Sequence, residues 1–349
     1  MNSPAGTRAH LLAGQAIPAL PLALDRRRRW QERRQRAVVR YYLDAGVGGI
    51  AVGVHSTQFE IREARHGLFE PVLALAAETM SSWKPLKRKP LIRIAGLCGR
   101  TPQALAEVEI SRRHDYDAGL LSLGAWKKDP ESAILRHCAR VARDFPLIGF
   151  YLQPSVGGRL LSYRFWREFA EIPNVLAIKI APFNRYQTLD VVRAVVDLGR
   201  DDVALYTGND DAIITDLLTP FPAGKQRTRH IVGGLLGQWG VWTERAVALL
   251  DEIKRVRSRK HLAAEWLTRN VALTDANAAV FDPAHGFAGC LSGIHEVLRR
   301  QGIFETTACL DPHEQLSPGQ ATELDRVTRN YPWLVDDAFV TANLDRWLA

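Results

Sequence analysis

The sequence predicts an α/β fold, a single (β/α)8 (TIM) barrel with additional C-terminal helices. Short β-rich apolar runs alternate with longer stretches of helical periodicity, and there are eight such runs. Strands that are apolar on both faces and alternate with helices are typical of parallel pairing. The rival, an open doubly wound sheet, would usually carry a glycine-rich turn after its first strand. Residues 23–29 read ALDRRRR instead, and Gly-x-Gly-x-x-Gly occurs nowhere.

The elements can be assigned in chain order. The strands are expected at residues 16–22, 49–54, 91–96, 118–123, 147–152, 175–180, 203–207 and 230–235. The helices are expected at residues 31–44, 63–80, 102–114, 131–144, 163–171, 185–198, 210–218 and 237–256. Residues 1–257 should therefore form the barrel. Residues 258–349 should form a helical extension packed on it, with its clearest helices at 263–272, 291–301 and 318–330.

The composition is that of an ordinary soluble globular protein, with 46% hydrophobic and 24% charged residues. No segment approaches the roughly 18 apolar residues of a membrane-spanning helix, and the first 25 residues lack the pattern of a secretory signal. The four cysteines are scattered without a C-x-x-C pair, which suggests neither disulfides nor a zinc site. These features predict a cytoplasmic protein.

The net charge is +8, and the most basic stretch is residues 26–36, with seven arginines. Such a stretch can bind nucleic acid or a membrane surface, or it can simply be the solvated face of a helix. No aromatic residues alternate with the arginines in the manner of a single-strand binding surface. We therefore favour the solvated face and expect neither a nucleic-acid nor a membrane partner.

Lys179 is the first candidate for chemistry. It lies in an otherwise apolar run, VLAIKI at residues 175–180. Burial penalises the charged form of lysine, so the amine should lose proton affinity and become able to attack a ketone. The alternative is a lysine whose ammonium reaches solvent along its own apolar chain.

Tyr151 is the second candidate, one expected strand earlier. It precedes a turn rich in proline and glycine, QPSVGG at residues 153–158. A phenol at that strand end could pass a proton to and from a carbinolamine. The alternative is a packed tyrosine whose hydroxyl meets water.

Together these stretches resemble the dihydrodipicolinate synthase / N-acetylneuraminate lyase family of class I aldolases. The resemblance consists of five stretches in the family's order. GQAIPAL (14–20) and GVGGIAVG (46–53) resemble its first two strands, and YLQP (151–154) resembles its tyrosine-asparagine-x-proline strand end. NVLAIK (174–179) resembles the strand of its Schiff-base lysine, and YTGNDD (206–211) resembles its serine-glycine-aspartate-aspartate turn. The resemblance implies Lys179 as nucleophile, Tyr151 as acid/base, and an imine of pyruvate or another 2-keto acid. It also implies a homo-oligomer, dimer or tetramer. We expect no cofactor and no metal.

The chain departs from the family in the loop after its second expected strand. Where the family has paired threonines, residues 54–59 read VHSTQF. The keto-acid carboxylate should therefore be bound by Ser56 or Thr57. His55 could take part in the proton relay or could be hydrogen-bonded under the loop. Gly233, in the eighth expected strand, allows a close backbone approach to substrate or is only a packing requirement.

Two further departures concern the distal end of the pocket. The family's synthases use a tyrosine from a neighbouring subunit where this chain has Trp126, and an arginine where it has Val156. Without a bidentate arginine, a carboxylated aldehyde would be poorly held. We therefore expect a carbon-carbon or carbon-oxygen lyase, of aldolase or dehydratase type, that uses a neutral aromatic or sugar-derived partner, and not dihydrodipicolinate synthesis itself. The second hypothesis is an inactive barrel that serves as a binding or regulatory protein.

Overall fold

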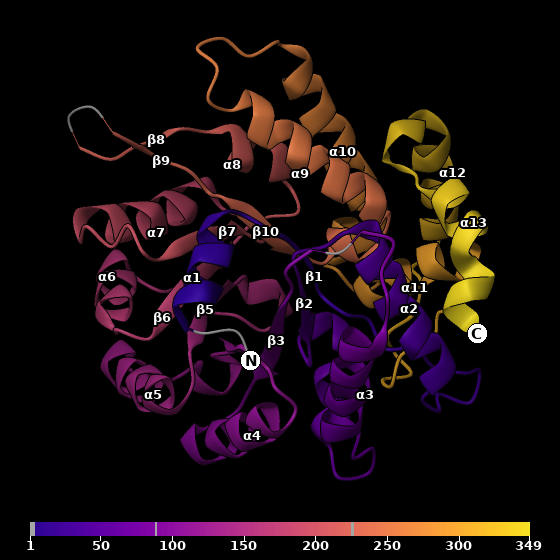
Figure 1. Cartoon of the computed structure of the whole chain (residues 1–349), viewed down its shortest axis with the longest axis horizontal. Helices are drawn as coiled ribbons and strands as arrows, with labels where there is room; N and C mark the ends of the chain where they lie inside the picture. Colours follow the sequence, from indigo (N-terminus) through magenta and orange to yellow (C-terminus); the bar gives the residue numbers. More distant parts are fainter. Residues whose placement is uncertain (1–3, 88, 225–226) are drawn as a thin grey trace.

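Eight parallel strands form a nearly closed barrel at the centre of the molecule (Figure 1). The structure, a computed structural model, describes residues 4–87, 89–224 and 227–349. The strand order is β1-β10-β7-β6-β5-β4-β3-β2, and the ring closes where Ala19 pairs with Ala51. The strand bounds are Ala16–Pro18 (β1), Gly49–Val52 (β2), Ile92–Leu97 (β3), Ala118–Leu121 (β4), Leu147–Leu152 (β5), Val175–Ala181 (β6), Ala204–Thr207 (β7) and Gly233–Leu236 (β10). The predicted barrel is confirmed, and each predicted run overlaps one of these strands.

A helix follows each strand on the outside of the barrel (Figure 1). The bounds are Glu32–Ala45 (α2), Phe69–Ser82 (α3), Thr101–Arg113 (α4), Glu131–Asp144 (α5), Tyr163–Glu171 (α6), Arg185–Asp197 (α7), Ile213–Leu218 (α8) and Thr243–Val256 (α9). Three of them, α3, α8 and α9, begin later than predicted, because loops at the barrel mouth come first. Short 3-10 turns at His55–Thr57 and Gln238–Gly240 belong to these loops. A small antiparallel hairpin, Phe221–Pro222 (β8) with Thr228–Arg229 (β9), was not predicted.

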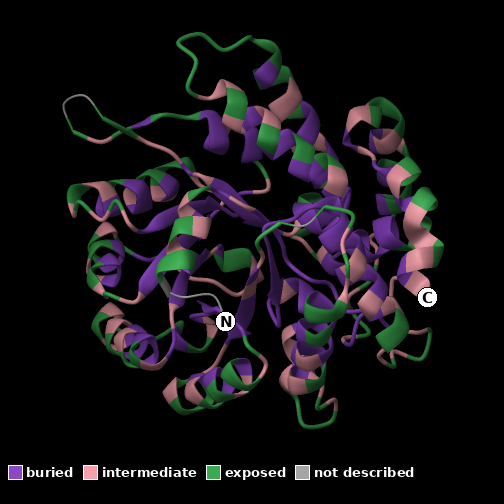
Figure 2. Ribbon diagram, viewed as in Figure 1, coloured by how far each residue is buried: buried purple, intermediate pink, exposed green. Residues whose placement is uncertain are grey.

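The strands bury both faces, which is why their sequences read as continuous apolar runs. Side chains such as Ile94, Ile148 and Leu235 fill the inside of the barrel. Side chains on the outer face pack against the helices, as Leu147 does. Figure 2 shows the strands buried at the centre and the surrounding helices buried on one side.

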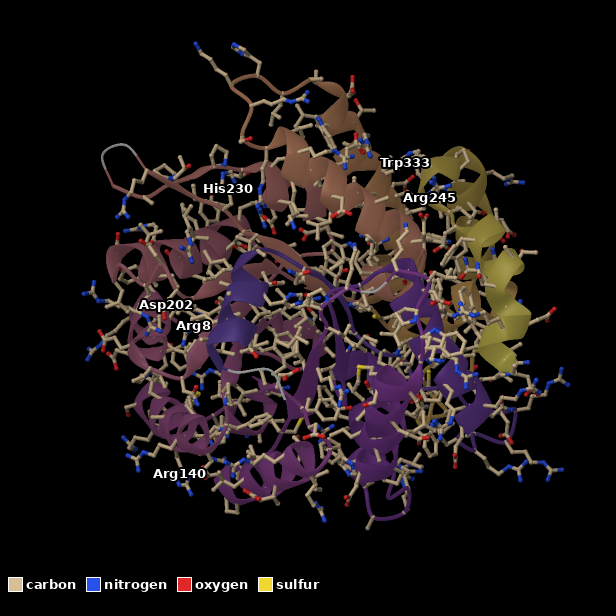
Figure 3. All side chains as sticks on the ribbon, viewed as in Figure 1. Arg8, Arg140, Asp202, His230, Arg245 and Trp333 are labelled. Atoms are coloured by element: carbon tan, nitrogen blue, oxygen red, sulfur yellow. The ribbon has the colours of Figure 1, made fainter. Side chains whose placement is uncertain are left out.

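An unpredicted helix, α1 (Pro4–Leu12), covers the N-terminal end of the barrel. Leu11 is fully buried with the interior side chains, and its carbonyl accepts a hydrogen bond from the Tyr206 hydroxyl at 2.8 Å. Arg8 donates to the Val175 carbonyl at the start of β6, at 3.3 Å. Its guanidinium also pairs with Asp202 (Figure 3). Substrate access is therefore expected at the opposite end, where barrels of this type carry their chemistry.

Four helices follow the barrel: Glu265–Phe281 (α10), Cys290–Arg300 (α11), Gln320–Asn330 (α12) and Asp337–Leu348 (α13). The first three overlap predicted helices, and α13 was not predicted. It packs along α2, where Arg40 donates to the Trp347 carbonyl at 2.6 Å.

Some arginines of residues 26–36 form hydrogen bonds within the chain, in addition to the solvent exposure that the sequence predicted. Arg28 donates to the Cys309 carbonyl at 3.0 Å, and Arg34 donates to the Gly302 carbonyl at 2.7 Å. Part of the basic stretch therefore holds the C-terminal segment against the start of α2. These carbonyl partners could not be predicted from local patterns, because they lie 281 and 268 residues away in the chain.

Asp44 is the central polar contact between α2 and α13. Its buried carboxylate accepts hydrogen bonds from the indole nitrogens of Trp83 at 3.0 Å and Trp347 at 2.7 Å, and pairs with Arg346. Replacing Asp44 with alanine should lower the free energy of unfolding by about 3 kcal/mol, because buried donors lose their acceptor. Denaturant unfolding measures this.

The matched control is Asp325→Ala, which removes the exposed partner of Arg300. Exposed ion pairs contribute up to about 1 kcal/mol. Equal effects of the two substitutions would contradict the role given to Asp44.

No helix in the described part of the chain has the length and apolar character required to span a membrane.

Candidate active site

A pocket opens at the C-terminal end of the strands, the end opposite α1. It holds about 620 Å³ of empty space, open solvent at its mouth included. Its floor comes from strand ends and its sides from the loops after β2, β5, β6 and β7. Its cover comes from α10, α11 and the turn between them, through Phe281, Phe287, Cys290 and Ile294.

Lys179 of β6 reaches this pocket with an almost fully buried side chain, 9% exposed. Its Nζ lies 4.4 Å from the centre of the Phe150 ring. Its stem passes over Gly208, where a Cβ would stand 2.6 Å from Cε of the lysine. Glycine at 208 thus leaves the space that the lysine occupies. Burial lowers the pKa of Lys179 to about 8, although the charge of Asp210 acts in the opposite direction.

Asp210 is the acidic group that lines the same pocket. Its carboxylate accepts the backbone N–H of Gln238 at 3.1 Å, and its carbonyl accepts the amide of Asn277 at 2.6 Å. Burial raises the pKa of Asp210 to about 7, against the hydrogen bond from Gln238 and the charge of Lys179. Near neutral pH the site therefore holds an amine and a carboxyl that can both exchange protons.

The turn that carries Asp210 is held rigidly from below. The N–H of Gly208 donates to the Ile180 carbonyl at 2.7 Å. The Asn209 side chain donates to Thr188 at 3.1 Å and to Asp216 at 2.9 Å. These contacts fix the direction in which residue 210 leaves the strand.

The loop after β2 brings His55 and Ser56 to the pocket, as the sequence predicted. Burial, and then the charge of Lys179, lower the pKa of His55 to about 4. The imidazole is therefore neutral at physiological pH, and it can act as a hydrogen-bond partner but not as a cationic acid. Ser56 is 4% exposed and turns its surface to the pocket.

Two residues predicted to contact substrate lie elsewhere. The Thr57 hydroxyl donates to the Leu20 carbonyl at 2.6 Å and accepts the Gly53 N–H at 3.0 Å, so it ties the loop to the barrel. Gly233 begins β10 at the N-terminal end, where a Cβ would stand 2.5 Å from the Gln15 carbonyl oxygen. Its role is packing, and both substrate-binding assignments are corrected.

The assignment of Tyr151 as acid/base is also corrected. The sheet register pairs Phe150 with Lys179 and Tyr151 with the next residue of β6, Ile180. Neighbouring strand residues point to opposite faces, so Tyr151 points out of the barrel. Its hydroxyl bonds the backbone of Leu161 at 3.2 Å, beneath α6. Phe150 takes the position beside the lysine and brings no proton to it.

The two distal residues behave differently. Val156 lines the pocket, as expected. Trp126 does not: its indole donates to the Gly99 carbonyl at 3.2 Å, and its ring stacks on His137 at 4.7 Å. Trp126 is therefore assigned no part in the pocket of its own chain.

Sequence reasoning did not select Asp210 or the aromatic cover. Asp210 stands in the YTGNDD stretch, so a signal was present. Phe183 and Phe287 both have left-handed backbones, with φ of 53° and 71°, and their rings meet edge to face at 5.9 Å. Strained residues of this kind gather at functional sites, but nothing in the sequence marks them.

Within the described ranges, no group of three or more His, Cys, Asp or Glu side chains is arranged to hold a metal ion.

Comparison with known proteins places this geometry in context. No family model matches the chain. Over 142 residues the chain is 30% identical to a 4-hydroxy-tetrahydrodipicolinate synthase of a Cyanothece species, a match that covers 40% of the chain and 46% of the relative. Over 175 residues it is 24% identical to the synthase of Persephonella marina, with 50% and 56% covered. The chain thus spans about half the length of the curated relatives it matches.

Solved structures share the fold over nearly the whole chain. A dihydrodipicolinate synthase of Acinetobacter baumannii, solved with pyruvate, superposes with a TM-score of 0.73 at 16% identity, and covers 92% of this chain and 99% of its own. An N-acetylneuraminate lyase of Fusobacterium nucleatum gives 0.71 at 16% identity, with 92% and 99% covered. The chain is therefore similar in sequence to dihydrodipicolinate synthases over part of its length, and it shares its barrel fold with solved dihydrodipicolinate synthase and N-acetylneuraminate lyase structures.

Proposed function

We propose that the chain is a lyase of aldolase or dehydratase type that forms an imine between Lys179 and pyruvate or another 2-keto acid. The observation that carries the proposal is the buried amine of Lys179, with its lowered pKa, in a pocket at the C-terminal end of the barrel strands. A neutral amine is the nucleophile that attack on a ketone requires. A structural neighbour from Acinetobacter baumannii was solved with pyruvate, which is in keeping with this substrate class.

The chemistry begins with attack of the Lys179 amine on the keto carbon, which gives a carbinolamine that loses water to form the imine. Asp210, with a pKa near 7, replaces Tyr151 as the group that gives a proton to the departing hydroxyl. The imine then accepts the electron pair released when a bond at the neighbouring carbon breaks. The Ser56 hydroxyl is the group we assign to the keto-acid carboxylate.

We further propose that the reaction is not dihydrodipicolinate synthesis itself. Val156 offers no charge to a carboxylate at the distal end. Among the described residues that line the pocket, Lys179 is the only lysine or arginine. The alternative, an inactive barrel that serves as a binding or regulatory protein, could use the basic stretch as its binding surface. It is less well supported now, because Arg28 and Arg34 bind carbonyls of the same chain. From the resemblance to the dihydrodipicolinate synthase / N-acetylneuraminate lyase family we propose a homo-oligomer. From the composition we propose a cytoplasmic location.

Incubation with pyruvate and borohydride tests the reaction class. We expect a single reduced adduct, located on Lys179 by peptide mass spectrometry, because burial keeps a usable fraction of this amine neutral. Omission of borohydride is the control and should leave no stable adduct. If neither pyruvate nor longer 2-keto acids give an adduct, the chain does not use imine chemistry.

A further inference from the structure

A second hollow of about 810 Å³, open solvent included, adjoins the pocket that holds Lys179. The two share His55, Val156 and Phe287 as a common wall. A molecule that extends from the lysine past this wall would therefore enter the second hollow.

The second hollow is acidic. Glu60, Asp311 and Glu314 line it, and no lysine or arginine is found among its described lining residues. Within the described ranges, none of the three carboxylates takes part in an ion pair. One carboxylate oxygen of Glu314 is buried without a hydrogen-bond partner. Burial, and then the charges of Asp311 and Glu60, raise the pKa of Glu314 to about 7, which places the three groups close together.

Gln58 gives a second, independent indication of a ligand. Its side chain lines the hollow and is 1% exposed. Its Oε1 accepts the backbone N–H of Leu310, whereas its Nε2 is buried with no partner in the described structure. A buried amide nitrogen carries two donors, and nearly all such groups in folded proteins are satisfied by protein, water or ligand. This donor calls for an oxygen acceptor beside the carboxylates.

We propose that the acidic subsite, formed by Gln58, Glu60, Asp311 and Glu314, binds the distal end of the substrate, and that this end carries an ammonium group next to a hydroxyl. The carboxylates accept from the ammonium, and the Gln58 amide donates to the hydroxyl oxygen. A bound metal ion is the poorer occupant, because no described cluster of these side chains has the arrangement that a metal requires. The proposal rests on the proposed function and narrows its substrate to an amino-bearing aldol.

Calorimetric binding to the whole chain near neutral pH tests the subsite with three sugars of similar size. Glucosamine carries an ammonium, glucose a hydroxyl and glucuronate a carboxylate in an otherwise similar ring. We expect glucosamine to bind about tenfold more tightly than glucose, the scale of one charge-assisted hydrogen bond. Glucuronate should bind most weakly, because its carboxylate meets acidic side chains and no cationic one among the described lining residues.

Variants locate the effect. Glu314→Gln should remove the preference for glucosamine. Glu60→Gln should reduce it, and this second variant keeps the test decisive if Glu314→Gln folds poorly. Glu171→Gln, an exposed change at the end of α6, is the matched control and should leave the preference intact. Equal affinity for glucosamine and glucose, or a preference that survives both subsite variants, would overturn the proposal.

The pyruvate adduct separates this inference from the reaction itself. An adduct on Lys179 without any preference for glucosamine would overturn the subsite and leave the imine chemistry standing. A preference that depends on Glu314, without an adduct, would support the subsite and overturn the reaction.

Discussion

Replacing Lys179 with methionine should abolish the borohydride-trapped adduct and lower the rate of aldol cleavage by roughly 10⁴-fold or more, the scale on which loss of a covalent nucleophile acts. Among the described residues that line the pocket, there is no second lysine to replace it. Methionine keeps the apolar stem that lies over Phe150 and Gly208. Because a buried amine is costly to hold, the melting temperature should stay level or rise. Mass spectrometry, a pyruvate-release assay and thermal unfolding measure the three quantities.

Lys254→Met is the matched control. Lys254 lies on α9 outside the pocket, donates to the Gly14 carbonyl at 3.0 Å, and also has a pKa lowered by burial. Its replacement should leave adduct and activity unchanged. An adduct that persists in Lys179→Met, or disappears in Lys254→Met, would place the reactive amine elsewhere.

The position of Lys179 could be read from the sequence because two independent signals agree on it. Alternation of apolar runs and helices gives the barrel, and the end of the sixth run is the end of a barrel strand that faces the site. A single lysine in that run is conspicuous, since burial of a lysine is costly. The structure places it in the pocket with a lowered pKa.

The face of Tyr151 could not be read in the same way. Residues 147–152, LIGFYL, are apolar on both faces, so the run contains no alternation that tells inside from outside. The pairing of β5 with β6 also shifts by one residue between Leu147 and Ile148. Counting residues from the strand starts therefore does not tell which residue of β5 lies beside Lys179. The tyrosine was assigned by its distance from Pro154, and a one-residue difference moves a side chain to the opposite face.

The cover of the pocket could not be predicted because it comes from the far end of the chain. Phe281, Phe287 and Cys290 reach the barrel mouth only after α10 and α11 have packed. Contacts of such high sequence separation leave no local pattern. The acidic subsite has the same origin, since Gln58 from the loop after β2 meets Glu314 from the segment after α11.

Asp210→Asn is the substitution with the second largest expected effect. Tyr151 points away from Lys179, so we assign the proton transfer to Asp210. Its loss should lower the rate of imine formation roughly 10²- to 10³-fold, the usual scale for loss of a general acid/base. The amide keeps the size of the side chain and an oxygen to accept the Gln238 N–H. Single-turnover formation of the trapped adduct measures the rate.

The pH profile distinguishes proton transfer from a structural role. In the parent protein the neutral amine of Lys179 increases as pH rises through about 8, and the protonated form of Asp210 decreases as pH rises through about 7. A rate that needs both forms has its maximum between these values. The variant should lose the alkaline decline that Asp210 causes. Its remaining acid limb should move to lower pH, because the carboxylate that raises the pKa of Lys179 is gone.

Asp211→Asn is the matched control, one residue further along the same turn. Asp211 is exposed, and it does not line the pocket that holds Lys179. Its loss should leave the rate within about twofold, since exposed substitutions of this kind perturb the free energy by less than about 0.5 kcal/mol. Equal losses of rate in the two variants would show that Asp210 has only a structural role in the turn. So would a slower Asp210→Asn whose pH profile matches the parent's. The proton would then have to come from Ser56 or from water, because the neutral His55, with its pKa near 4, supplies no cationic acid at neutral pH.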